Sequence, residues 1–443
     1  MVNTLGRTVH RMRPPGGRQL RTFASLTAAG LGEAVLPTLS LIALVRLTGS
    51  ETSGQVIFAQ SVATVWFLLC DPCLENAAQR FVPIEQQRSG RGSALFMRLI
   101  HLDVAIGVAA TGLSLTALLT ARLLEHVSDE FALMLALAIV ARGAMASYGT
   151  AGAAFALTDR LRALGSLRTR CALLSFGLSL GGLLLGGPLL YLAGQAAGAL
   201  VMAVVFYLLA TRGLVAELGP AVARVRLPSD MVAFTVKTSL GTSVAGISDS
   251  GILTLAGLLG GPNLVTILKI ASAPGRFYAN LAVPVAAMLY PRIVRAVTAG
   301  AGTAPIRRDI ARTALLFTVA GAATLAVALP TTDAVIGMAY GAQYAHIGVV
   351  AVVLLGAACV KGAVCWSNVL PLALGRPGWR LAYLSAEGVM LLGVLLAAAW
   401  TASGPFQASR CFAWGALAVA VLGTGFWIAS LRHITDLKCS DFR

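Results

Sequence analysis

The sequence has little charge. Only 12% of its 443 residues are Asp, Glu, Lys or Arg, whereas 57% are apolar. A soluble globular domain is about 45–50% apolar and about 25% charged, so an interior surrounded by water could not hold this many apolar side chains. The mean hydropathy of +0.80 agrees with this composition. These values exclude a water-soluble fold and predict a membrane protein.

Paired cysteines and long polar loops are also scarce. The seven cysteines are scattered and lie mostly in apolar runs, where cysteine behaves as a small hydrophobe, so we predict no disulfide framework. Cys70 and Cys73 have the spacing of a redox or metal pair, but no second pair or histidine cluster accompanies them. The loops are too short for a soluble catalytic domain. We therefore predict that the chain is no enzyme and holds no cofactor and no metal.

Apolar runs of membrane-spanning length fill the chain instead. A helix needs about 20 mostly apolar residues to cross the hydrocarbon core of a bilayer. Runs bounded by charges and Gly/Pro clusters predict an all-α polytopic membrane protein with about twelve transmembrane helices. The predicted spans are 23–47, 54–82, 94–121, 131–157, 171–193, 195–215, 231–259, 264–290, 313–333, 346–372, 380–401 and 407–431. Residues 1–22 form a basic tail without a recognisable cleavage site.

Arginines recur in every second loop. Arg88 and Arg91 follow the second predicted span, Arg160 and Arg162 follow the fourth, and the outer loops carry almost only Arg122. Because basic residues of short loops stay on the cytoplasmic side, we predict that both termini are cytoplasmic and that the protein lies in the inner (cytoplasmic) membrane. The net charge of +16 then reflects topology, and we predict no nucleic-acid partner.

Two outer hairpins resemble each other. Residues 48–61 align without gaps on residues 259–272, with Gly49 opposite Gly260 and Ser61 opposite Ser272. This pattern predicts two six-helix lobes in parallel orientation, as in transporters with internal repeats; chance likeness of apolar segments is the alternative. The predicted parts are a basic tail (1–22), an N-terminal lobe (23–215), a cytoplasmic linker (216–230), a C-terminal lobe (231–431) and a second tail (432–443).

Cations inside the predicted spans are candidate substrate ligands. A charged side chain costs about 2.5–3.5 kcal/mol at the centre of a spanning helix, so such residues face a wet cavity or pair with one another. Lys269 and Arg276 are seven apart and share a helix face, and Arg142 and Lys361 lie near mid-depth. A guanidinium can bind two phosphate oxygens at once. Together these residues predict a cationic cavity that fits a diphosphate-bearing substrate.

Acids inside the spans are candidates for coupling transport to a proton or another cation. Asp71 and Glu75 are four apart, which places them on one face of a continuous helix, while Asp249 and Glu387 lie in the second half. The alternative is that these acids only pair with the cations of the spans and hold helices together. Prolines such as Pro274 predict bends in these helices.

Three segments carry a family resemblance. The first is GQVIFAQSVATVWFLLCDPCLENAAQR at 54–80, the second is the stretch 249–291 that runs into Tyr290 and Pro291, and the third is 336–376 with AYGAQY and LGR. In their order and placement they resemble the Wzx-like polysaccharide flippases of the multidrug/oligosaccharidyl-lipid/polysaccharide exporter (MOP) superfamily. Asp71 to Cys73 stands where that family usually has a plain glycine, which puts the exact substrate in doubt.

The resemblance implies a two-lobed inner-membrane transporter that flips an undecaprenyl-diphosphate-linked oligosaccharide for surface polysaccharide assembly. A polysaccharide polymerase and glycosyltransferases would be its partners, beside the membrane lipids. A drug/cation antiporter of the same superfamily is the nearest alternative. A major-facilitator carrier would carry a Gly-x-x-x-Asp-Arg-x-Gly-Arg loop after the second span, which is absent. A membrane polymerase or ligase would need a long outer loop with catalytic Arg or His.

Overall fold

The chain is built from helices. The computed structural model describes residues 17–220, 225, 227, 229–298, 304–374 and 377–436, and no strand occurs among them. The helices are α1 (Gly17–Cys70), α2 (Leu74–Ser89), α3 (Gly92–Leu123), α4 (Asp129–Ala144), α5 (Tyr148–Leu157), α6 (Leu161–Leu218), α7 (Ser229–Thr298), α8 (Ala304–Tyr340), α9 (Gly348–Ala363), α10 (Leu370–Ala373), α11 (Pro377–Thr401) and α12 (Pro405–Asp436), with short 3-10 turns at Ala342–Ile347 and Cys365–Asn368.

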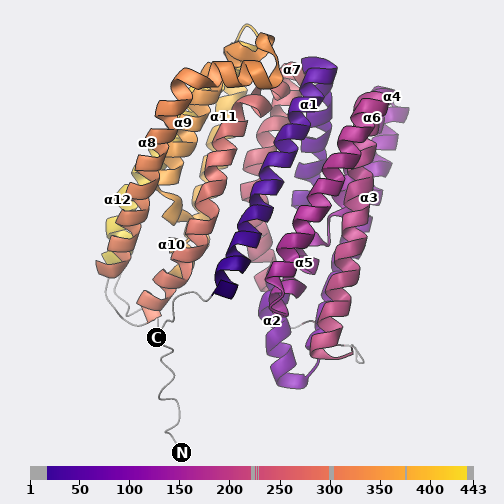
Figure 1. The fold of residues 1–443 in the computed structure, drawn as a ribbon, viewed down its shortest axis with the longest axis vertical. Coiled ribbons are helices and arrows are strands. Elements are labelled where there is room, and N and C mark those ends of the chain that lie inside the picture. Colours follow the sequence, from indigo (N-terminus) through magenta and orange to yellow (C-terminus); the bar gives the residue numbers. More distant parts are fainter. Residues whose placement is uncertain are drawn as a thin grey trace, which may run out of the picture.

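Nine helical segments of the described chain are long and apolar enough to cross a membrane. Three of them contain a glycine with positive φ at which the helix folds back, namely Gly49 (φ 79°), Gly187 (φ 73°) and Gly261 (φ 72°). Glycine adopts this conformation without the clash of a Cβ, so each of these segments crosses twice. The prediction of about twelve spans in two six-helix lobes is confirmed, with α1–α6 in one lobe and α7–α12 in the other (Figure 1).

The boundary predicted between the fifth and sixth spans, at residues 193–195, is wrong. The reversal lies at Gly186 and Gly187, directly before Pro188, a residue that is favoured at the start of a helix. Gly194 has another role: a Cβ at this position would lie 2.3 Å from the carbonyl oxygen of Leu178. Gly194 allows the two helices of the hairpin to approach each other closely. In the sequence alone, a glycine of this kind cannot be told from one that ends a helix.

The structure also corrects the register of the repeat by one residue. Gly49 (φ 79°, ψ −179°) and Gly261 (φ 72°, ψ −175°) have the same conformation, so Gly49 matches Gly261 rather than Gly260. In this register Pro72 matches Pro284. The fourth spans correspond as well, because α4 and α9 are both 16 residues long. Each ends two residues after a cation, Arg142 or Lys361.

The two lobes meet at the end that carries the glycine reversals and diverge toward the end at which α1 begins and α12 ends (Figure 1). Thr266 Oγ1 donates to the carbonyl of Ser50 at 2.7 Å, and Gly54 lies directly against Pro262. Ser50 matches Pro262 and Gly54 matches Thr266 in the corrected register, so the contacts are related by the repeat. A buried cluster with Leu41, Val45 and Ile57 of α1 and residues of α7–α12 continues this contact.

One wall between the lobes is an antiparallel helix pair. We call the part of α1 after Gly49, together with α2, the second span. It runs along the first part of α7. Thr254 contacts Ser61 through the hydroxyls at 3.2 Å, and the rings of Phe81 and Phe234 pack with centroids 5.7 Å apart. Large apolar side chains such as Leu185 are exposed on the outer faces, as a lipid-facing surface requires.

Candidate functional site

Three predicted cations from the two lobes lie close enough for their charges to interact. Lys269 and Arg276 lie on the second half of α7, both are half-buried, and Arg142 comes from α4 of the other lobe. Arg276 Nη2 donates to Ser272 Oγ at 2.5 Å, and Lys269 lies within electrostatic reach of Arg276, Arg142 and Asp249. We call Arg142, Lys269 and Arg276 the interlobe cationic group.

Arg142 is fixed by a neighbour from the second span. Its Nε donates to Thr64 Oγ1 at 2.9 Å, which leaves the terminal nitrogens of the guanidinium available for a ligand. Thr64 matches Arg276 in the register of the repeat. In the N-terminal lobe, Arg142 of the fourth span therefore contacts the position of the second span that Arg276 occupies in the C-terminal lobe.

A cavity of about 410 Å³ lies inside the C-terminal lobe. Its lining includes four of the predicted site residues: Asp249, Arg276, Lys361 and Glu387. Arg276 therefore belongs both to the lining of this C-lobe cavity and to the interlobe cationic group. Asp249 also lines the cavity, and its charge interacts with Lys269. The helical backbone continues through Pro274 and Gly275, and the bend predicted there stays a prediction.

Lys361 and Glu387 form an ion pair across the C-lobe cavity. Glu387 is 5% exposed, while the lysine side chain is 46% exposed. A buried carboxylate needs such a partner because desolvation without one is costly. For these two residues the pairing alternative of the sequence analysis is the better supported one, and we assign them a role in holding α9 against α11.

A double-mutant cycle tests this assignment. Removing one partner of a buried pair costs about 3–5 kcal/mol, and because Lys361 is half exposed we expect Lys361→Met to lose about 1–3 kcal/mol of unfolding free energy. Lys361→Met combined with Glu387→Gln should recover most of that loss and retain transport. Thermal unfolding in detergent measures the stabilities. A double variant that is stable but inactive would instead identify the pair as ligands.

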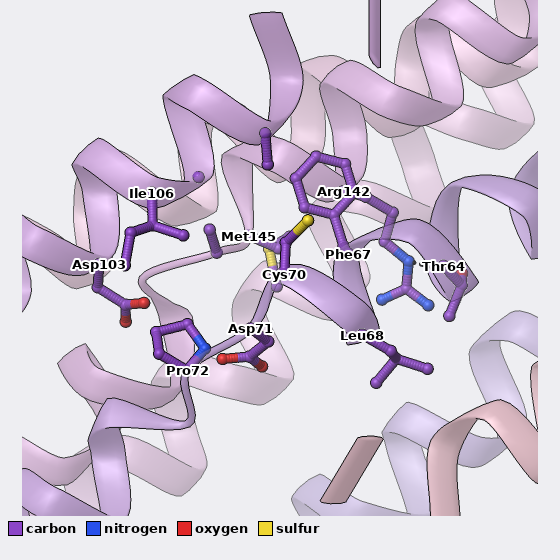
Figure 2. A pocket seen from close by; sticks show the side chains of 13 residues that line it. Thr64, Phe67, Leu68, Cys70, Asp71, Pro72, Asp103, Ile106, Arg142 and Met145 are labelled. Carbon is purple, nitrogen blue, oxygen red and sulfur yellow. Dashed lines mark hydrogen bonds between the residues drawn. The ribbon is translucent and has the colours of Figure 1, made fainter. Parts of the chain in front are cut away.

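A second cavity, of about 160 Å³, lies inside the N-terminal lobe. Asp71 and Asp103 lie around Pro72 on one side of it, and Arg142 lies on the other (Figure 2). Asp103 is 3% exposed and accepts a hydrogen bond from Thr150 Oγ1 at 2.6 Å. The sequence analysis did not select Asp103, although an acid within the apolar run of α3 was the signal that could have identified it.

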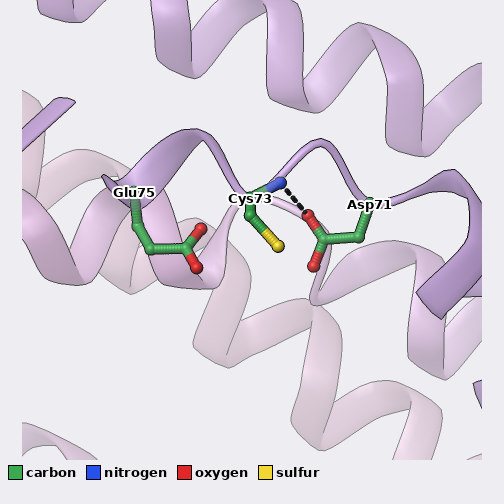
Figure 3. A group of neighbouring side chains, drawn as sticks. All are labelled: Asp71, Cys73 and Glu75. Carbon is green, nitrogen blue, oxygen red and sulfur yellow. Dashed lines mark hydrogen bonds between the residues drawn. The ribbon is translucent and has the colours of Figure 1, made fainter. Parts of the chain in front are cut away.

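Asp71 and Glu75 do not share a helix face as predicted. The helix ends at Cys70 and resumes at Leu74, because Pro72 cannot donate a backbone hydrogen bond and Asp71 Oδ1 accepts the N–H of Cys73 at 2.8 Å. Cys73 has φ 49°. The two acids nevertheless lie together on one side of the break (Figure 3). One carboxylate oxygen of each acid and the sulfur of Cys73 lie within 4.8 Å of one another.

The N-terminal lobe thus holds an acid group, Asp71, Glu75 and Asp103, that the sequence predicted in part. Asp71 and Glu75, together with Cys73, have the spacing of a metal site, but one carboxylate oxygen of Asp71 already accepts the backbone N–H of Cys73. The absence of a metal stays a prediction. Two members of the acid group, Asp71 and Asp103, line one cavity together with Arg142.

Comparison with known proteins identifies the fold. No protein-family model matches the chain, and no curated protein does. Among solved structures, a multidrug resistance MATE family transporter of the MOP superfamily in an inward-facing conformation matches with a TM-score of 0.70 at 14% identity, over 94% of this chain and 99% of that one. The same kind of transporter in an outward-facing conformation matches with a TM-score of 0.60 at 14% identity, over 96% of this chain and 100% of that one.

A MOP superfamily transporter from Pyrococcus furiosus matches with a TM-score of 0.62 at 14% identity, over 96% of this chain and 99% of that one. It is described as having a binding pocket of reversed polarity that suggests a different function. These matches show that the chain has the two-lobed twelve-helix fold of MATE and MOP transporters.

Proposed function

We propose that the chain flips an undecaprenyl-diphosphate-linked oligosaccharide from the cytoplasmic to the outer leaflet of the inner membrane by alternating access. Surface polysaccharide assembly would use the product, with glycosyltransferases supplying the substrate and a polymerase consuming it. The acid group of the N-terminal lobe, with Asp249 as a further candidate, would couple the cycle to a proton or another cation.

The observation that carries the proposal is the interlobe cationic group. Three basic side chains, Arg142, Lys269 and Arg276, lie together there, with one acid, Asp249, beside them. A diphosphate bears charges that match this excess, and Arg forms paired hydrogen bonds with phosphate oxygens. Two charges come from one lobe and one from the other, so a bound headgroup touches both lobes, as a substrate of alternating access must.

The conformation of the two lobes supports binding of the substrate from the cytoplasmic side. The lobes are closed at the end predicted to face outward and diverge toward the end predicted to be cytoplasmic (Figure 1). The higher TM-score to an inward-facing transporter than to an outward-facing one agrees with this arrangement. A lipid-linked substrate made on the cytoplasmic side would enter from that end.

Export of drugs is the second candidate, and the matched structures favour it because they are described as multidrug resistance transporters. Asp249 and the acid group could serve a cationic drug. The interlobe cationic group argues against this, since a cation would meet three like charges there.

Complementation in two host strains separates the candidates. In a strain that lacks its own polysaccharide flippase, expression of the chain should restore surface polysaccharide. In a strain that lacks its main drug exporters, resistance to lipophilic cations should stay unchanged. Restored resistance without restored polysaccharide, with the chain present in the membrane of both strains, would replace flipping by drug export.

A further inference from the structure

Two serines of the C-terminal lobe donate hydrogen bonds to backbone carbonyls at the break in the second span. Pro72 has no N–H, so the carbonyl of Leu68, four residues earlier, lacks its helical donor. Ser243 Oγ donates to that carbonyl at 2.5 Å. Ser239, one turn away on α7, donates to the carbonyl of Asp71, also at 2.5 Å. One lobe therefore supplies the hydrogen bonds that the other has lost, at the contact between them.

The break requires more than a proline. Pro284 matches Pro72 in the second lobe, and α7 stays helical through it. The first lobe differs by Asp71, whose Oδ1 accepts the N–H of Cys73 (Figure 3), whereas Val283 stands at the matching position. A carboxylate that binds a nearby backbone N–H stabilises a turn in place of a helix. The side chain of Asp71 therefore holds the break open.

Asp71 joins the acid group to the lobe contact through two different atoms. Its carboxylate lies beside Glu75, and its main-chain carbonyl accepts from Ser239. In a continuous helix the N–H of Glu75 would bond to the carbonyl of Asp71, since helical N–H groups bond four residues back. Ser239 would then have to share this carbonyl oxygen with the N–H of Glu75. The serine contact and the helical bond therefore compete for one acceptor.

We propose that Ser239 and Ser243 are positioning residues of the transport cycle. They fasten the C-terminal lobe to the second span while the turn at Asp71 is intact, so a change at the Asp71 carboxylate is passed to the interface between the lobes. The proposal rests on alternating access, which is part of the proposed function, and is independent of the substrate that is carried.

Spin-label distances between the lobes test the first half of the proposal. Labels replace the exposed Ser89 at the end of α2 and the exposed Arg312 on α8, in a chain with Cys411 and Cys439 changed to serine. Ser239→Ala and Ser243→Ala each remove one hydroxyl. Each variant should lower the population of the conformer described here, relative to the other conformers, by about two- to tenfold. Ser239→Thr, which keeps the hydroxyl, should restore the parent ratio.

Ser179→Ala is the matched control, because this buried serine donates within its own helix, to Ser175 at 2.6 Å. Its conformer ratio should equal that of the parent. An unchanged ratio in the Ser239→Ala/Ser243→Ala double variant would overturn the proposal. The labels report the positions of the lobes without substrate. Failure of the flippase assignment would therefore leave this result unaffected, and an unchanged conformer ratio would leave the flippase assignment unaffected.

Coupling between Asp71 and Ser239 tests the second half. Asp71→Ala removes the acceptor for the N–H of Cys73, and Ser239→Ala should then shift the conformer ratio no further. Asp71→Asn keeps an acceptor oxygen and should resemble the parent, which provides a second variant if Asp71→Ala does not accumulate. Effects of Asp71→Ala and Ser239→Ala that simply multiply would show that the turn and the serine contact are independent.

Discussion

Replacing Arg276 with alanine is expected to abolish export of the lipid-linked glycan while the chain still inserts into the membrane. Hydrogen bonds to charged groups contribute about 1.5–3 kcal/mol each, and each 1.4 kcal/mol is a factor of about ten. Arg276 offers several donors to a diphosphate and also holds Ser272. We expect transport to fall at least about tenfold for Arg276→Ala, and Lys269→Ala to have a similar effect.

Arg276→Lys and Arg410→Ala are the controls. The lysine keeps the charge but loses the planar fork, so partial transport is expected. Arg410 is exposed on α12 and packs over the ring of Phe406, away from the interlobe cationic group, so its loss should change transport little. Surface polysaccharide and membrane content are measured together. Normal polysaccharide in Arg276→Ala and in Lys269→Ala would exclude the pair as substrate ligands.

Gly54→Ala is expected to prevent closure of the outer end. An added Cβ would lie 2.0 Å from the carbonyl oxygen of Pro262, and that oxygen belongs to backbone that cannot rotate away. Overpacking of this kind costs about 1–3 kcal/mol or more, which corresponds to a shift of about tenfold or more against the closed state. Transport by alternating access needs that state, so export should be lost as well.

Cross-linking measures this closure. Ser53 and Thr266 face each other from the two lobes, with their hydroxyl oxygens 3.3 Å apart, so cysteines at both positions should form a disulfide in the parent and little in Gly54→Ala. Gly177→Ala is the matched control, because a Cβ there meets nothing within 4 Å. Equal cross-linking in Gly54→Ala and in the parent would show that the outer ends close by another route.

Much of the fold could be predicted because a bilayer imposes length and hydropathy on every span. The hairpin boundary near Gly187 could not, since Gly194 at a close helix crossing and Gly187 at a reversal look alike in sequence. The register of the repeat was misplaced by one residue for a similar reason: Gly260 and Gly261 are adjacent, and only the backbone conformation shows which of them turns the chain.

The candidate site was predictable where its residues share one helix. Lys269 and Arg276 lie together because helical periodicity places them so, and their proximity to Arg142 of the other lobe required the fold. Asp71 and Glu75 lie together for a reason other than the one predicted, since the turn at Pro72 rather than a helix face brings them close. Asp103 joins them only through the packing of α3 against the break.

Flipping by the purified protein tests the central claim most directly. The chain is reconstituted into liposomes with a labelled undecaprenyl-diphosphate oligosaccharide, and the fraction of substrate that becomes accessible in the opposite leaflet is followed over time. We expect transfer well above that of protein-free liposomes and of Arg276→Ala. Transfer no faster than in protein-free liposomes, from protein that moves a lipophilic cation in the same vesicles, would contradict the account.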